Sequence, residues 1–146
     1  DVYKRQAKMA DFVAAHKQAA GDHPVFGLGY SNGANILAAV CFRHPELFDR
    51  ICLMHPLIPW QPADNPELAG TEVLITAGQN DPICPLPMTN RLIDYFRAQG
   101  SDTQAFLHPG GHEVPPDEIG TTLSFLQSGP RPQAERPTSE FERNTP

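Results

Sequence analysis

The chain has 146 residues, a formal net charge of −6 at pH 7 and a hydrophobic content of 40%. This length allows one domain with a modest core and excludes two complete domains. The negative charge and the absence of basic runs argue against nucleic acid as a partner, and no apolar stretch reaches the roughly 20 residues that a membrane span needs.

Residues 1–6 have an unusual origin when they are read back into DNA. One reverse translation of them, GAT GTG TAT AAG AGA CAG, looks like the mosaic end of a transposon-based sequencing adapter. We expect these six residues to be a sequencing artefact rather than a genuine short amino terminus, and they do not enter the fold prediction. After them, Met9, Phe12, Val13 and Ala20 trace a helical face that Gly21 can end.

The next segment places a serine between two glycines at the junction of two apolar runs. Residues 25–28 are strand-like, residues 34–42 are apolar on nearly all sides, and a Gly-x-Ser-x-Gly pentapeptide centred on Ser31 lies between them. A strand that turns sharply into a helix strains its corner serine, and glycines two positions before and after it relieve the crowding. The pattern predicts a nucleophile elbow with Ser31 as nucleophile and Gly29 and Gly33 as the relieving glycines. The alternative is an ordinary turn.

A serine hydroxyl needs a histidine base and an orienting carboxylate to become a nucleophile. The strand-like residues 72–77 lead to Asp81, and the strand-like residues 103–108 lead through a glycine-rich loop to His112. The carboxyl ends of parallel strands are where sites assemble in α/β sheets. The order Ser31, Asp81, His112 therefore predicts a catalytic triad, with His112 as base and Asp81 as orienting acid. Turn chemistry at Asp-Pro and a flexible Gly-Gly-His corner are the alternatives.

The other histidines are expected to be structural or solvated, including His55 at the end of a predicted strand over residues 50–55. His108 and His112 are a weak metal pair because Pro-Gly-Gly separates them and no ligand cluster completes the set, so we expect no metal and no cofactor.

The three cysteines, an odd number without metal-ligand spacing, suit a reducing compartment and favour a cytoplasmic location. They are Cys41, Cys52 and Cys84, and Cys84 is expected near the site because it follows Asp81 by three residues.

Strands alternate with helices along the chain, which predicts an α/β fold with a mostly parallel sheet and right-handed crossovers. One helix should bury the apolar face formed by Met88, Leu92, Tyr95 and Phe96, and a last helix opened by Pro115-Pro116 should bury another. That face consists of Ile119, Thr122, Leu123 and Leu126. From residue 128 to 146 the chain is polar, and we expect it to be disordered.

These motifs together resemble the phospholipase/carboxylesterase family of α/β-hydrolases, relatives of the dienelactone hydrolases. The resemblance covers about residues 25–126 and rests on residues 29–35, 44–48, 53–56, 78–82 and 110–112. It implies a serine esterase acting on small carboxylic esters, with lysophospholipids or acyl thioesters as alternative substrates. Dienelactone hydrolases proper tend to use cysteine where this chain has Ser31, which argues against that narrower assignment.

The resemblance also implies parts of the site that the motifs do not contain. The Asn32 N–H would be one oxyanion donor, and the loop after the third strand of the family fold would supply the second. The segment that follows His55 would project over the triad, so Leu57 and Trp60 are candidates for a substrate pocket, and Ile83, two residues after Asp81, is a third candidate. The alternative for Trp60 is that it covers the core.

A complete α/β-hydrolase sheet has about eight strands, with the nucleophile after the fifth. Ser31 comes too early for that, so we expect an amino-terminally truncated fragment that is itself inactive. Its partial α/β-hydrolase domain would span residues 7–127. The alternative of another functional class is a non-catalytic remnant or interaction module.

Overall fold

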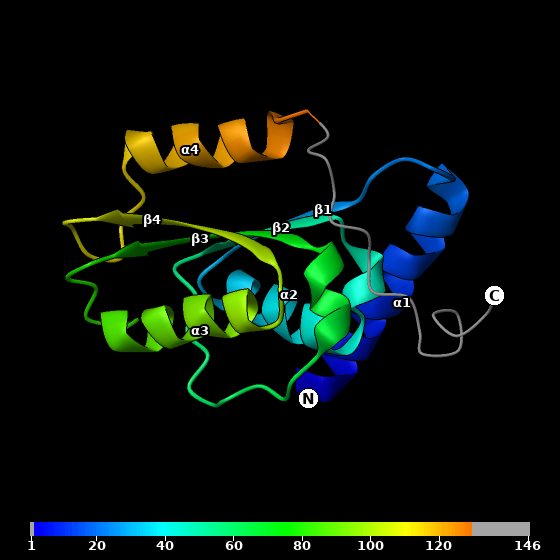
Figure 1. Cartoon of the computed structure of the whole chain (residues 1–146), viewed down its shortest axis with the longest axis horizontal. Coiled ribbons are helices and arrows are strands. Elements are labelled where there is room, and N and C mark those ends of the chain that lie inside the picture. The colour runs from blue at the N-terminus through cyan, green and yellow to red at the C-terminus, as the bar shows by residue number, and fades with distance from the viewer. Residues whose placement is uncertain (1, 130–146) are drawn as a thin grey trace.

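The computed structural model describes residues 2–129 and folds them into a parallel sheet with helices on both faces (Figure 1). The strands are β1 (Phe26–Tyr30), β2 (Arg50–Met54), β3 (Glu72–Gly78) and β4 (Asp102–His108). The helices are α1 (Val2–Ala20), α2 (Asn32–Arg43), α3 (Leu86–Ala98) and α4 (Pro116–Gln127), with short 3₁₀ helices at Pro45–Leu47 and Pro66–Gly70. All four strands are parallel, in the order β1-β2-β3-β4. The predicted α/β fold is confirmed.

The two central strands, β2 and β3, are buried along their whole length. Helices α2 and α3 cover one face of the sheet and α4 covers the other, while α1 packs against α2 (Figure 1). Two apolar clusters result, because a parallel sheet with helices on both faces needs apolar side chains on both sides. The larger includes Ile51, Val73 and Phe96, and the smaller includes Leu74 and Phe125 beneath α4.

Strand β1 forms one edge of the sheet in the described part of the chain. Its alternate side chains Phe26, Leu28 and Tyr30 are exposed, Leu28 to 55% of its surface. An edge strand presents unpaired backbone groups, and apolar side chains beside them favour association with other chains. This edge therefore favours association of the chain with other chains in solution.

Helix α1 ends where it was expected to end, at Ala20, and is followed by Gly21, whose φ of 67° lies in the left-handed region that favours glycine. The face predicted for this helix is wrong at Met9 and Phe12, which are exposed, whereas Val13 packs against the core.

Helix α3 buries Leu92, Tyr95 and Phe96 as the helical spacing predicts, whereas Met88 is only partly buried.

The face predicted for the last helix is right at Thr122 and Leu126 but wrong at Ile119 and Leu123. Helix α4 buries Glu118, Thr122 and Phe125, whereas Ile119 and Leu123 are about half exposed. The spacing favoured the apolar residues, but a buried histidine binds the Glu118 carboxylate and turns that side of the helix toward the sheet. A charged group can occupy such a position when a partner compensates its lost hydration.

Some predictions stay untested. Residues 2–6 belong to α1, which does not decide whether they derive from an adapter. The tail predicted to be disordered lies outside the described residues except for 128 and 129. Within the described part of the chain, no helix combines the length and apolar character required to cross a membrane.

Candidate active site

Ser31 lies at the turn between β1 and α2, where the predicted elbow requires it. Its backbone has φ 55° and ψ −117°, a region that L-residues rarely adopt. The Ser31 N–H donates to the Met54 carbonyl oxygen at 2.8 Å, which ties the turn to β2. Among the described non-glycine residues, only Ser31 and His55 have positive φ. Strain of this kind persists where the surrounding structure imposes it, and it gathers at functional sites.

The two glycines of the pentapeptide differ in what they contribute. A Cβ atom on Gly29 would lie 2.5 Å from the Gly33 carbonyl oxygen and 2.7 Å from the Ala34 nitrogen, so glycine is required there. A Cβ atom on Gly33 would meet nothing within 4 Å among the described residues. The prediction that Gly33 relieves crowding is therefore wrong among the described residues. The Gly33 backbone is instead the group that a side chain at position 29 would collide with.

The structure brings Ser31, His112 and Asp81 into one hydrogen-bonded chain. The Ser31 Oγ lies 3.0 Å from His112 Nε2, and His112 Nδ1 lies 2.6 Å from Asp81 Oδ2. The three residues follow β1, β4 and β3, so the carboxyl ends of three parallel strands supply them. His112 is partly exposed, whereas the Asp81 side chain is fully buried.

Asp81 is held from several directions. Its Oδ1 accepts the N–H groups of Ile83 at 2.8 Å and Cys84 at 3.0 Å, and its Oδ2 accepts from His112. Burial alone would raise the pKa of Asp81, but the hydrogen bonds from Cys84, His112, Ile83 and His55 outweigh it and lower the pKa to about 2. The carboxylate is therefore ionised at neutral pH and can orient an imidazole.

The loop that carries His112 is pressed against the loop that carries Asp81. A Cβ atom on Gly78 would overlap the Gly111 carbonyl oxygen, so only glycine fits at the end of β3. The Asn80 side chain donates to the Pro109 carbonyl oxygen at 2.7 Å. The Tyr30 hydroxyl, from the strand before the nucleophile, donates to the His112 carbonyl oxygen at 2.7 Å. These contacts fix the position of the imidazole from both sides.

Two residues that the sequence did not predict lie beside the hydrogen-bonded chain of Ser31, His112 and Asp81. His55 is fully buried, with its Nδ1 3.2 Å from Asp81 Oδ2 and its Nε2 2.7 Å from Glu118 Oε1. The place of His55 directly after β2, between the strands that precede Ser31 and Asp81, is the signal that could have found it. Glu118 offered no such signal, because an acid in the first turn of a helix is expected on grounds of the helix dipole alone.

Cys84 lies near the site, as expected. Its thiol donates to the His55 carbonyl oxygen at 3.4 Å. Burial, together with the nearby charge of Asp81, raises the pKa of this thiol to about 11. Cys84 is therefore a neutral packing group at physiological pH and no competitor to Ser31 as a nucleophile.

The sequence model of the dienelactone hydrolase family matches residues 1–113 of the chain. The chain belongs to this family. The predicted resemblance to the phospholipase/carboxylesterase family and its dienelactone hydrolase relatives is confirmed. The family model that matches is that of the dienelactone hydrolases, which the motifs indicated as relatives. A curated relative from Bacillus subtilis (strain 168), named "Putative hydrolase MhqD", is 33% identical over 116 residues. The matched region is 78% of this chain and 58% of that protein, so the chain spans less than two thirds of its length.

Solved structures give the same result for this dienelactone hydrolase family member. The protein Atu2452 from Agrobacterium tumefaciens, of unknown function, is 48% identical with a TM-score of 0.81, covering 86% of this chain and 62% of its own. The Bacillus cereus carboxylesterase is 27% identical with a TM-score of 0.75, covering 86% and 60%. A Mesorhizobium loti carboxylesterase is 27% identical with a TM-score of 0.73, covering 88% and 62%.

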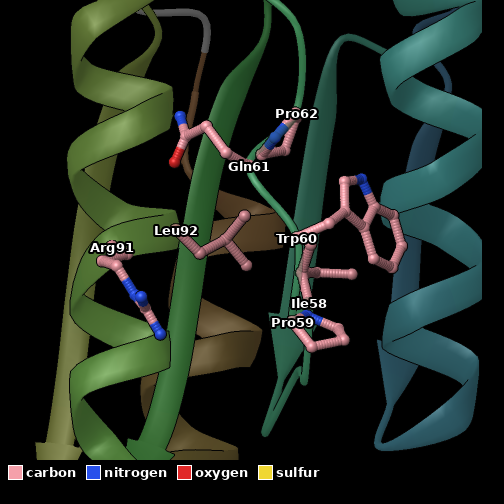
Figure 2. Close-up of a pocket in the computed structure, with 7 residues that line it drawn as sticks. All are labelled: Ile58, Pro59, Trp60, Gln61, Pro62, Arg91 and Leu92. Atoms are coloured by element: carbon pink, nitrogen blue, oxygen red, sulfur yellow. The ribbon is translucent and has the colours of Figure 1, made fainter.

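The three residues predicted to form a substrate pocket have different surroundings, and a shared pocket beside Ser31 stays a prediction. Trp60 faces a hollow of about 60 Å³ shared with Ile58 and Leu92, and its indole turns toward α2 (Figure 2). Trp60 also lines a larger hollow with residues of α1 and α2. Neither hollow is lined by Ser31, His112 or Asp81. The smaller one is well below the size of ligand pockets. Leu57 donates its N–H to the Asn35 side chain, and Ile83 is exposed beside Asp81.

Two groups of side chains in the described part of this family member have the spacing of metal ligands. One is His55, Asp81 and His112, and the other is His55, His108 and Glu118. His108 and His112, considered as a metal pair in the sequence and not expected to be one, do not occur together in either group. In both groups His55 already makes hydrogen bonds through its ring nitrogens.

Proposed function

We propose that the full-length protein is a serine carboxylesterase that hydrolyses small carboxylic esters through an acyl-enzyme. The observation that carries this proposal is the hydrogen-bonded chain from Ser31 Oγ through His112 to Asp81, which starts on a strained turn between a strand and a helix. A nucleophile within hydrogen-bond reach of a base that a third group orients is the geometry of nucleophilic acyl transfer.

In this mechanism His112 Nε2 takes the proton from Ser31 Oγ as the oxygen attacks the ester carbonyl. Asp81, ionised at neutral pH, accepts the Nδ1–H of His112 and stabilises the imidazolium that forms. His112 then gives the proton to the leaving alcohol, and water releases the acyl group in a second cycle. The N–H of Asn32, in the first turn of α2 where backbone N–H groups have no partner within the helix, would face the oxyanion.

The comparisons support an ester as substrate. Two solved structures at 27% identity carry the name carboxylesterase, and the matching family is that of the dienelactone hydrolases, whose substrates are also esters of carboxylic acids. Dienelactone hydrolases proper tend to use cysteine at the position of Ser31, so a serine favours open-chain carboxylic esters over the cyclic ester in the family's name.

A fluorophosphonate probe and an aryl-ester assay test the proposal on the full-length protein. Only an activated serine reacts with the probe, so we expect labelling of the native protein and none of Ser31→Ala, together with a loss of turnover of about 10⁶-fold. Equal secondary structure of both proteins by circular dichroism is the control. Parental activity in Ser31→Ala would sink the assignment of the nucleophile. Acyl chains of increasing length, on oxygen and thioester leaving groups, separate the carboxylesterase from a lysophospholipase or a thioesterase.

A further inference from the structure

A buried cluster of ionisable groups adjoins Asp81 and plays no part in the mechanism above. His55, at the end of β2, and Glu118, on α4, are both fully buried, and their side chains meet at 2.7 Å. The other ring nitrogen of His55 lies 3.2 Å from Asp81 Oδ2, the same oxygen that accepts from His112. Burying a charge costs free energy unless an opposite charge pairs with it. The energetic cost of this cluster therefore depends on which of its atoms carry hydrogens.

The neighbouring His108 fixes part of this arrangement. Its Nδ1 accepts the Gly110 N–H at 3.0 Å, and a backbone N–H can only donate, so this nitrogen carries a lone pair. The ring hydrogen of His108 therefore sits on Nε2, which lies 3.6 Å from Glu118 Oε1 without a hydrogen-bond partner. A hydrogen directed at Glu118 favours the ionised form of its carboxyl.

Both nitrogens of His55 face carboxylate oxygens. Ionised carboxylates only accept hydrogen bonds, so contacts to Asp81 and Glu118 together require a hydrogen on each ring nitrogen. His55 is then an imidazolium between two carboxylates, and its single positive charge offsets one of their two negative charges. The ionisable groups packed around His55 come from five elements or loops: Tyr30, Asp81, Cys84, His108, His112 and Glu118.

We propose that His55 is a positioning residue, a doubly protonated imidazole that holds Asp81 in place for His112, with Glu118 as its counter-ion. The proposal rests on the proposed function, in which Asp81 orients the base. With His55 in place, Asp81 receives two hydrogen bonds on each oxygen and has no freedom to rotate away from His112. The positive φ of His55 shows that its position is imposed on the backbone, as at Ser31.

The same atoms could in principle surround a metal ion. The separation of 2.7 Å between His55 Nε2 and Glu118 Oε1 is that of a direct charge-assisted hydrogen bond, which an intervening ion would break. We therefore assign the contact to a proton, and metal dependence becomes an outcome of the test.

The protonation of His55 can be read directly on the resting full-length protein. Nitrogen-15 NMR of the imidazole separates a ring with two N–H groups from either neutral tautomer, and we expect two N–H groups on His55 across the pH range of activity. A neutral His55 would overturn the proposal. Because this measurement needs no turnover, it decides the protonation of His55 even if Ser31→Ala retains activity and the proposed esterase function fails.

The positioning role is tested by Glu118→Gln, which keeps the volume of the side chain and removes its charge. We expect kcat to fall about tenfold with KM nearly unchanged, as for outer-shell groups that orient a functional side chain, and one N–H of His55 to be lost. Thr122→Val is the matched control, because Thr122 is buried one turn further along α4 and touches Cys52 rather than the cluster.

Three results would overturn the positioning role. One is a Glu118→Gln protein with the kcat of Thr122→Val, and another is a fall in thermal stability with full activity per folded molecule, which is the mark of a structural role alone. The third is activity that a chelator removes and Zn²⁺ restores, which would assign the cluster to a metal.

Discussion

The pH response of the fold depends on Asp81, whose pKa is lowered from 3.8 to about 2 because its hydrogen bonds outweigh its burial. A carboxyl whose pKa is lower in the folded state adds stability above its unfolded pKa and loses it as the pH falls through the folded value. We expect the free energy of unfolding of the full-length protein to decline between about pH 4 and pH 2 for this reason. Urea denaturation of Asp81→Asn should show a shallower decline than the native protein. Parallel curves would contradict the shift.

Substitution of Asp81 distinguishes the loss of the orienting acid from the loss of the covalent nucleophile. Asp81→Asn should lower kcat by about 10⁴-fold, less than the loss of about 10⁶-fold expected for the nucleophile, because the acid orients the base without forming a bond to the substrate. Asp117→Asn is the control, since Asp117 is exposed in the first turn of α4. An inactive Asp117→Asn beside a fully active Asp81→Asn would show that the acid is misassigned.

The candidate site was predictable where chemistry follows a strand end in the sequence. Ser31 directly follows β1, and Asp81 and His112 lie in the loops that follow β3 and β4. Parallel strands bring their carboxyl ends together whatever the details of packing. Glu118 was not predictable, because its burial depends on a partner 63 residues away that the sequence does not link to it.

At the scale of the elements, the close approach of two loops sets a steric limit at Gly78. Gly78→Ala should destabilise the fold by about 1–3 kcal/mol and lower activity, because its Cβ would meet the Gly111 backbone rather than a flexible side chain. Gly120→Ala, inside α4 with nothing within 4 Å of its Cβ, should instead stabilise by about 0.5–1 kcal/mol. Thermal unfolding of both variants checks the difference in sign. Equal melting temperatures would mean that the two loops separate readily.

The strands and most helices followed from the sequence because their signals are local. Continuous apolar runs in β2 and β3, and Gly21 after α1, need no tertiary information. The prediction for α4 failed at Ile119 and Leu123 because periodicity ranks them above Glu118, whereas Glu118 is buried in contact with His55. Tertiary contacts overrode the local pattern there.

At the scale of the whole molecule, the outer side of β1 governs how this chain behaves by itself. Phe26 and Leu28 are exposed beside backbone groups that no strand pairs within residues 2–129. We expect the 146-residue chain, expressed alone, to be poorly soluble because such an edge recruits other chains. We also expect its esterase turnover to be at least 10²- to 10³-fold below that of the full-length protein, since Asn32 would act without a second oxyanion donor. Size-exclusion chromatography with light scattering measures the solubility and association of the chain, and an aryl-ester assay measures its turnover.

Phe26→Lys together with Leu28→Lys should raise solubility without restoring turnover, which distinguishes the effect of the exposed edge from that of the oxyanion site. A soluble monomer with full turnover would contradict both arguments.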